Sequence, residues 1–229
     1  MTPPRVPHGP HGHPDHRKMH EAVWTREQAI AALEDPTRSA SEDPQALWQR
    51  AGLAEGMSVA EVGAGSGFYS FPASDLAGSS GRVVAIDVSA ELVEMMRERA
   101  RAEHRLNLEV RLSEPGRIPL PDAIADRVLL ANVLHGIPPA TVKEAVRLLR
   151  PGGRLIDLDW KKEPTSRGPP VAHRLAASVA RRTLERYGLR AVEEWDAGPY
   201  HYVVMLEKPS GPGVPSPVRR TRARRRSRG

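Results

Sequence analysis

Three glycines at alternate positions, Gly63, Gly65 and Gly67, follow a short apolar run that carries one acid. The run, Ser58 to Val62, has the composition of a buried strand, and Glu61 is its only charged residue. Glycine lets the chain turn sharply and lets a ligand approach the bare backbone. The first N–H groups of a following helix would face the same ligand. This turn is therefore the first candidate binding site.

The spacing of the glycines differs from that of a dinucleotide-binding site. A dinucleotide fingerprint has Gly at the first, third and sixth positions of the turn. Here the sixth position is Phe68, and the third glycine comes one residue early. Loops are also often rich in glycine for conformational reasons alone, so the assignment depends on the residues that follow.

A second apolar run, Arg82 to Asp87, follows the turn and ends in an acid. In nucleotide-binding α/β sheets an acid at this place accepts hydrogen bonds from ribose hydroxyls. Ser89 is the expected N-cap of the next helix, with Glu91 in its first turn and its end near Glu103. A simple turn residue is the alternative for Asp87, because strand ends are often polar.

Further strand-like runs alternate with helical patterns, which predicts an α/β fold with a mostly parallel sheet. A helix is expected to begin at Pro138 and Pro139 and to be stopped by the Pro-Gly-Gly of residues 151–153. The other expected elements are strands at Leu108–Glu114, at a run ending in Leu130–His135, and at Arg154–Asp159, a helix-like segment at Val171–Tyr187, and strands at Ala191–Trp195 and Tyr200–Leu206.

Only Asp196 to Pro199 joins the last two expected strands. A connection of this length is too short for a parallel crossover, so the two strands must form an antiparallel hairpin. The expected fold is therefore a Rossmann-like, seven-stranded, mostly parallel α/β sheet with a C-terminal antiparallel hairpin and helices on both faces.

This order of motifs resembles the class I S-adenosylmethionine-dependent methyltransferases, in particular the ubiquinone/menaquinone-type, methyltransferase type 11-like domain. The resemblance covers roughly residues 43–207. It rests on the G-x-G-x-G turn, on Asp87, on the Pro-Gly-Gly after a helix and on the terminal hairpin. It implies an enzyme that transfers a methyl group directly from its cofactor S-adenosyl-L-methionine, with a small molecule as the expected acceptor.

The resemblance also implies site residues at the carboxyl ends of the strands. Glu114 would contact the adenine amino group, where Asp is more usual, and Asp126 would be structural. Asn132 and His135 would lie nearest the reacting methyl group. His135 is the candidate catalytic base, since its ordinary pKa is near neutral, and a structural hydrogen bond at a strand end is the alternative. The expected cofactor-binding residues are Glu61, Gly63, Ala64, Gly65, Gly67, Asp87, Val88, Ser113, Glu114 and Asn132.

Both ends of the chain differ in composition from the middle. Residues 1–20 are rich in Pro, Gly and His, and residues 209–229 hold seven arginines and no acid. We expect disordered tails there, flanking a methyltransferase domain at 21–208. Its N-terminal helices, patterned at Thr25–Leu33 and from Asp43, would form a lid over the cofactor or simply pack on the sheet. The histidines predict adventitious metal binding and no dedicated metal site.

The arginine tail holds the whole basic excess of the chain, whose net charge is +6. Of the 34 Lys and Arg residues, seven lie in this tail, which leaves 27 against 28 acids. A basic arm can bind nucleic acid or an anionic surface through non-specific contacts. A solvated tail without a partner is an equal alternative. The segment Asn132 to His135 lacks the Asn/Asp-Pro-Pro-aromatic motif of amino-methylating DNA enzymes.

Composition excludes several other functions. The chain has 229 residues, of which 39% are hydrophobic, enough for one sizeable core. It has no cysteine, which rules out disulfides, thiolate metal or arsenic sites and a cysteine nucleophile for cytosine methylation. The sequence shows no apolar run of membrane-spanning length and no secretory signal, so a cytoplasmic location is expected by default.

Two alternative functions stay open beside the methyltransferase. One is a nucleotide-binding Rossmann-like oxidoreductase, against which the missing sixth-position glycine and the terminal hairpin argue. The other is a non-catalytic cofactor-binding protein of the same fold.

Overall fold

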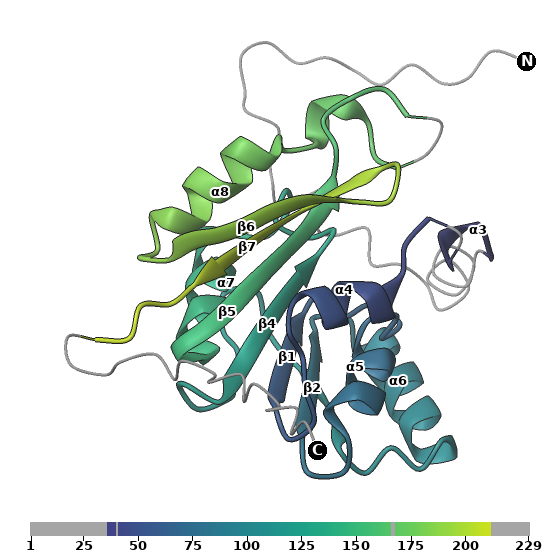
Figure 1. The fold of residues 1–229 in the computed structure, drawn as a ribbon. Coiled ribbons are helices and arrows are strands. Elements are labelled where there is room, and N and C mark those ends of the chain that lie inside the picture. Colours follow the sequence, from purple (N-terminus) through teal and green to yellow (C-terminus); the bar gives the residue numbers. More distant parts are fainter. Residues whose placement is uncertain (1–35, 40, 166–167, 212–229) are drawn as a thin grey trace, which may run out of the picture.

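The computed structural model describes residues 36–39, 41–165 and 168–211. A seven-stranded sheet crosses this part of the chain in the order β3-β2-β1-β4-β5-β7-β6 (Figure 1). Its strands are β1 (Ser58–Val62), β2 (Arg82–Asp87), β3 (Leu108–Leu112), β4 (Ala125–Ala131), β5 (Leu149–Trp160), β6 (Arg190–Ala197) and β7 (His201–Glu207). The pairs among β3, β2, β1, β4 and β5 are parallel, and β7 is antiparallel to both β5 and β6.

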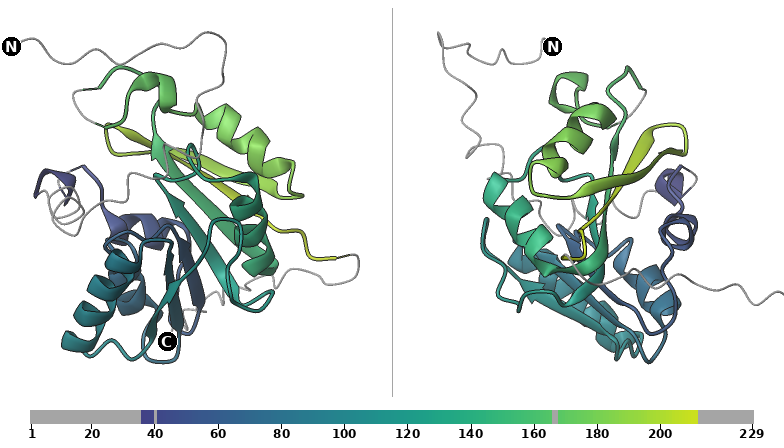
Figure 2. Two further views of the ribbon diagram at one scale, coloured as in Figure 1. Left: turned by 180° about the vertical axis from the view of Figure 1, so that it is seen from behind. Right: turned by 60° about the vertical axis from the view of Figure 1, so that its left-hand side comes forward.

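Helices cover both faces of this sheet (Figure 2). The helices of one face are α4 (Pro44–Arg50), α5 (Ser70–Ala77) and α6 (Ala90–Ala102), and those of the other are α7 (Pro139–Leu148) and α8 (Ala177–Glu185). The short α3 (Pro36–Ser39) precedes α4, and a 3-10 turn, η1 (Val171–His173), precedes α8.

Two hydrophobic cores result, one on each face. Side chains of a strand alternate between faces, so on β5 Ile156 packs in the core beneath α4 to α6 and Leu155 packs in the core beneath α7 and α8. Parallel strands covered on both sides need apolar side chains on both faces. This explains why the strands read as continuous apolar runs in the sequence.

The expected fold class and its terminal hairpin are confirmed. The bounds of β2 match the prediction, and the expected helix caps are present. Asp43 accepts a hydrogen bond from the Ala46 N–H at the start of α4, and Ser89 does the same for Leu92 in α6. Local sequence signals therefore position β2 and the starts of α4 and α6 correctly.

The expected helix stop at Pro-Gly-Gly and the expected start of the next strand at Arg154 are wrong. α7 ends at Leu148 and β5 begins at Leu149, so the Pro-Gly-Gly of residues 151–153 lies inside the strand and does not stop the helix. Proline favours an extended residue before it, and the register of β4 and β5 shifts at this point, between Ala125 and Arg127.

The expected helix-like segment at Val171–Tyr187 is confirmed in part, because it is broken into η1 and α8. Arg174 lies between them with an extended backbone, φ −83° and ψ 146°, and its buried side chain turns inward to bind backbone carbonyls. The third strand also ends earlier than expected, at Leu112.

Several expectations lie outside the described residues. They are the helix at Thr25–Leu33, the tail at 1–20 and all but the first three residues of the tail at 209–229. Within the described part of the chain, no helix has both the length and the apolar character needed to cross a membrane.

Candidate functional site

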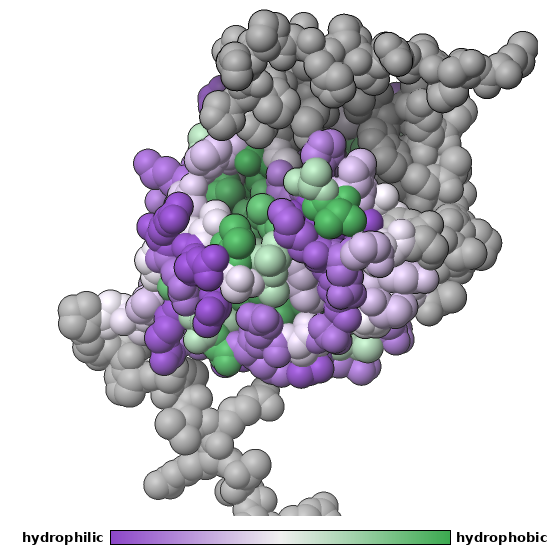
Figure 3. Space-filling view, turned by 90° about the horizontal axis from the view of Figure 1, so that it is seen from above, coloured by the Kyte–Doolittle hydropathy of each residue, from purple (hydrophilic) through white to green (hydrophobic). Residues whose placement is uncertain are grey.

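The carboxyl ends of β1, β2, β4 and β5 meet along one edge of the sheet. β1 pairs with β2 on one side and with β4 on the other, so the strand order changes direction beside β1. Ligands of open α/β sheets bind in the crevice at such a point. The face seen from above the view of Figure 1 shows apolar residues between hydrophilic ones (Figure 3).

The glycine-rich turn is tied to the end of β2 by backbone hydrogen bonds. The N–H groups of Gly63 and Ala64 donate to the carbonyl oxygen of Ile86, at 2.8 and 3.0 Å. The N–H of Gly65 donates to Oδ2 of Asp87, at 2.8 Å. The structure therefore brings the first expected binding motif directly against the second.

Two of the three glycines are required by neighbouring side chains. Gly63 has φ +79°, and a Cβ there would stand 2.7 Å from Cγ1 of Val133. Gly67 has φ +82°, and its Cβ would stand 2.8 Å from the ring of Phe71. Gly65 also has a positive φ, of 59°. These packing contacts could not be predicted from the local sequence, because Val133 follows a different strand.

Asp87 has a structural role in addition to its expected ligand role. Its side chain is 8% exposed, and its two oxygens accept the N–H groups of Gly65 and Ser89. Burial raises the pKa of this carboxyl, and the backbone N–H donors oppose that shift. A carboxylate has about four lone-pair sites, so the Asp87 carboxyl keeps some capacity to accept a hydrogen bond from a ligand.

Exposed apolar side chains lie beside Asp87. Val88 follows Asp87 and is 57% exposed. Leu112 on β3, the register partner of Asp87, is 44% exposed. Ser113 donates its N–H to the carbonyl oxygen of Asp87 at 2.9 Å, so it is adjacent as well. Glu114 differs: its side chain is 74% exposed and is 3.9 Å from Arg117. Apolar surface beside an acid suits a nucleoside, with a flat base next to a ribose.

Glu61 lies inside the protein and not on the open edge. Its buried carboxyl accepts a hydrogen bond from the Ser70 hydroxyl at the start of α5. Burial raises its pKa to about 8, so the side chain is neutral at pH 7. In this structure Glu61 links β1 to the helix that follows the glycine-rich turn.

Asn132 occupies the turn after β4 with an unusual backbone. Its φ is +59°, and its N–H donates to the carbonyl oxygen of Leu158 at 2.7 Å. Its Oδ1 atom is buried and has no hydrogen-bond partner among the described residues. Buried polar atoms are rarely left unpaired, so this oxygen is an exception within the described structure.

His135 pairs with an acid that the sequence analysis did not single out as a site residue. Its Nδ1 atom lies 2.9 Å from Oδ2 and 3.1 Å from Oδ1 of Asp159, which is fully buried near the end of β5. The same Oδ1 accepts the Trp160 N–H at 2.7 Å. The hydrogen bond to Asp159 raises the pKa of His135. The sequence did offer a signal for this pair, because Asp159 lies near the end of the strand that was expected to follow the one before His135.

Trp160 organises the loop that follows β5. Its ring centroid lies 4.2 Å from that of His201 and 6.2 Å from that of Tyr200, and Arg174 lies over the ring at 5.3 Å. Arg174 donates to the carbonyl oxygens of Pro169, Lys161 and Glu163. Both ends of the loop are therefore held at the edge of the sheet where His135 lies.

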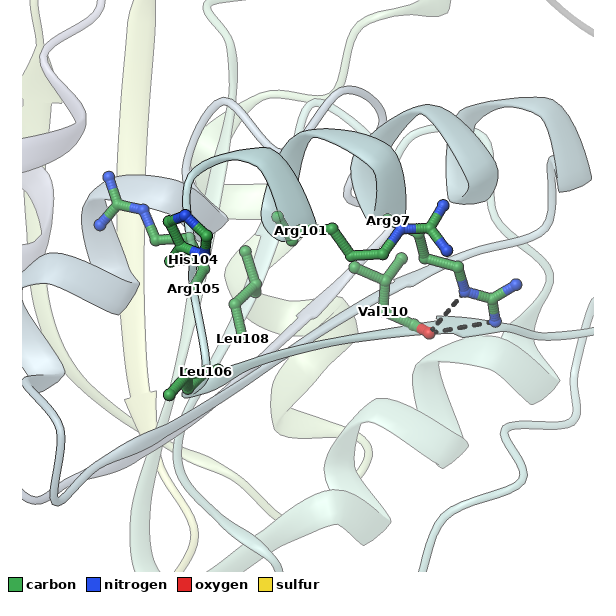
Figure 4. A pocket seen from close by; sticks show the side chains of 8 residues that line it. Arg97, Arg101, His104, Arg105, Leu106, Leu108 and Val110 are labelled. Atoms are coloured by element: carbon green, nitrogen blue, oxygen red, sulfur yellow. Dashed lines mark hydrogen bonds between the residues drawn. The ribbon is translucent and has the colours of Figure 1, made fainter.

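A separate pocket of about 350 Å³ lies under α6 beside β3 (Figure 4). It contains none of the expected site residues, and its lining mixes arginine side chains with leucine and valine. Arg97 there donates to the carbonyl oxygen of Val110. We place the candidate site at the carboxyl edge instead, because the strand order reverses there and the unpaired Asn132 oxygen lies there.

Comparison with known proteins identifies the family. A family model described as a methyltransferase domain matches residues 60–157. A solved S-adenosylmethionine-dependent methyltransferase from Aquifex aeolicus is 35% identical, with a TM-score of 0.75, and the match covers 78% of this chain and 96% of that one. The chain belongs to the class I S-adenosylmethionine-dependent methyltransferases. The resemblance found in the sequence is confirmed.

Two curated relatives are similar to this methyltransferase over part of their length. The arsenite methyltransferase of Halobacterium salinarum is 30% identical over 156 residues, which are 62% of this chain and 40% of the relative. The ubiquinone/menaquinone biosynthesis C-methyltransferase UbiE of Hahella chejuensis is 33% identical over 129 residues, 52% of this chain and 51% of the relative. This chain thus spans about half the length of these relatives or less.

Proposed function

We propose that this protein transfers a methyl group from S-adenosyl-L-methionine to a small-molecule acceptor. The observation that carries the proposal is the 2.8 Å hydrogen bond from Gly65 to Asp87, which joins the glycine-rich turn to the acid at the point where the strand order reverses. Bound there, the methyl donor would supply an already activated sulfonium methyl group. The protein has then mainly to align the acceptor and exclude water.

The residues of the carboxyl edge would divide the binding of the methyl donor. Asp87 would accept the ribose hydroxyls on its remaining lone pairs, and Val88 would cover the adenine ring beside Ser113. Glu114 would reach the adenine amino group from its exposed position. Asn132 would accept a hydrogen bond from the methyl donor on its unpaired Oδ1. The backbone of Gly63, Ala64, Gly65 and Gly67 would line the turn, and Glu61 would support it through Ser70.

His135 would lie beside the acceptor as the catalytic base. Its Nδ1 is engaged by Asp159, and no partner is assigned to Nε2 among the described residues. A base is needed only where the acceptor loses a proton.

An organic acceptor fits this chain better than arsenite. One curated relative is named as an arsenite methyltransferase and another as a quinone-biosynthesis C-methyltransferase. The chain has no cysteine, so it has no thiolate with which to hold arsenic. We therefore propose a small organic molecule.

Calorimetry with S-adenosylhomocysteine and with NADH tests the proposed function. We expect S-adenosylhomocysteine to bind and NADH not to bind. The reverse result would favour the oxidoreductase alternative. An acceptor panel with labelled methyl donor then separates an active enzyme from a binding protein of the same fold.

We also propose a modular chain, with a methyltransferase domain at 21–208, lid helices at its start, and tails at 1–20 and 209–229. The tail at 209–229 would bind nucleic acid or an anionic surface by charge alone, because it holds seven arginines and the rest of the chain is nearly neutral. We also propose that the protein is cytoplasmic.

A further inference from the structure

The acid–imidazole pair of Asp159 and His135 joins two neighbouring strands at the edge proposed to hold the methyl donor. His135 lies in the turn after β4, and Asp159 lies one residue before the end of β5, with Nδ1 and Oδ2 2.9 Å apart. Asp159 is fully buried, whereas the His135 side chain is 18% exposed. The acid is thus shielded from solvent, and the imidazole lies between it and the surface.

The hydrogen bonds of Asp159 select one tautomer of His135. Oδ1 of Asp159 accepts the Trp160 N–H at 2.7 Å, and Oδ2 lies 2.9 Å from Nδ1 of His135. A carboxylate can only accept hydrogen bonds. The proton of the neutral imidazole must then reside on Nδ1. Nε2 carries the lone pair and is the atom able to take a proton.

The other titratable groups packed around the pair are buried. Asp157, on the same face of β5, is fully buried, and desolvation raises its pKa well above the usual range. Tyr202, opposite Asp159 on β7, also has a raised pKa because it is buried. Burial lowers the pKa of His201, on which Arg38, Glu42 and Arg174 also act. Among the described residues, Asp159 is the charged group that acts on His135, and it favours the imidazolium.

We propose that Asp159 is a positioning residue for His135, and that the pair selects acceptors that lose a proton when methylated. This inference rests on the proposed function. Suitable acceptors are hydroxyl groups and acidic carbon atoms. Thioethers and tertiary amines have no proton on the reacting atom, and arsenite reacts through an arsenic lone pair that is already free, so none of them needs a base to create its nucleophile.

The proposed step is balanced in atoms and charge. The acceptor O–H or C–H bond gives its proton to Nε2 of His135, and the electron pair left on the acceptor forms the new bond to the methyl carbon. The methyl–sulfur bond breaks with its electron pair on sulfur, which yields S-adenosylhomocysteine. The resulting imidazolium is paired with Asp159 until it releases the proton to water.

Nitrogen-15 NMR of the full chain tests the pairing without any acceptor. We expect wild-type His135 to carry its proton on Nδ1 above its pKa, and that pKa to lie above the ordinary value. Asp159→Asn should lower the pKa of His135. Asp157→Asn is the matched control, two residues away on the same face, and should leave the tautomer unchanged. A proton on Nε2 in the wild type would overturn the proposal even if Asp159→Asn does not fold.

Labelled methyl transfer tests the acceptor class. We expect phenols or 1,3-dicarbonyl compounds to be methylated, and thioethers, tertiary amines and arsenite not to be. Asp159→Asn should reduce kcat by about 100-fold or more, with the affinity for S-adenosylhomocysteine unchanged. Turnover confined to the lone-pair acceptors, or a kcat that His135→Gln does not change, would overturn the inference. If the wild type does not bind S-adenosylhomocysteine, the proposed function itself is rejected.

Discussion

Gly65 donates its backbone N–H to Oδ2 of Asp87 across 2.8 Å, so the turn after β1 and the end of β2 are one connected structure. The second oxygen of Asp87 accepts the N–H of Ser89 at the start of α6. One acid thus joins a strand, a turn and a helix at the edge proposed to bind the methyl donor. Its removal should therefore affect both folding and binding.

Asp87→Ala should weaken the binding of S-adenosylhomocysteine by roughly 10- to 100-fold, since a hydrogen bond to a charged group contributes about 1.5–3 kcal/mol. It should also lower the free energy of unfolding, because the N–H groups of Gly65 and Ser89 lose their acceptor. Calorimetry and chemical denaturation measure the two effects. Asp87→Asn, which keeps one acceptor oxygen, is the control and should destabilise less. Unchanged affinity in Asp87→Ala would show that the end of β2 is not part of the site.

Gly63→Ala should destabilise the protein by more than the cost of its backbone conformation. Its Cβ would stand 2.7 Å from Cγ1 of Val133, at φ +79°. Gly188 is a matched control, because its φ is +82° and nothing lies within 4 Å of a Cβ there. We expect Gly188→Ala to cost about 1–2 kcal/mol and Gly63→Ala to cost more. The added Val133→Ala change should recover part of the difference in denaturation experiments, and equal costs at the two glycines would contradict the packing argument.

Glu61→Gln should change how stability depends on pH. The folded-state pKa of Glu61 is raised by burial from 4.5 to about 8, so the folded protein binds this proton more tightly than the unfolded chain. The contribution of this bound proton to the free energy of unfolding is complete below pH 4.5 and is lost as the pH rises to about 8. Relative to the variant, the wild type should lose up to about 1.4 kcal/mol per pH unit in that interval. Parallel denaturation curves for the two proteins from pH 5 to 8 would refute the assignment.

Arg174→Ala should loosen the loop after β5. The guanidinium donates to the carbonyl oxygens of Pro169, Lys161 and Glu163, and no side chain of similar length replaces it in the variant. We expect trypsin to cleave after Lys161 and Lys162 faster in the variant than in the wild type, and mass spectrometry measures the rate. The exposed Arg182 on α8 provides the control, since its substitution by Ala should leave the cleavage rate unchanged. Equal rates in both variants would mean that the loop is held by other contacts.

The seven arginines of residues 219–228 should bind DNA oligonucleotides or anionic vesicles with an affinity that falls steeply as salt is added. Changing all seven to Gln should abolish this binding, and changing all seven to Lys should preserve most of it, since both lysine and arginine carry the charge. The affinity for S-adenosylhomocysteine should stay constant in each protein. Binding that persists in the Gln protein would place a basic surface on the folded domain.

Elements with strong local signals could be predicted from the sequence alone. The apolar run of β2 ends in Asp87 at the expected residue, and Ser89 caps α6 as expected. The short connection before β7 was enough to require a hairpin. Each of these depends on neighbours within a few residues, whose preferences are set by backbone geometry and capping.

Contacts between distant segments were decided by the tertiary structure. Asp159 meets His135 only because β4 and β5 pair in one register, which brings the carboxyl ends of these strands together. Gly63 is needed because Val133, 70 residues further along the chain, packs against it. Arg174 interrupts a helical pattern because its charge is satisfied by carbonyl groups of a preceding loop. Register is a property of the whole sheet, so local patterns in the chain do not show which side chains meet across it.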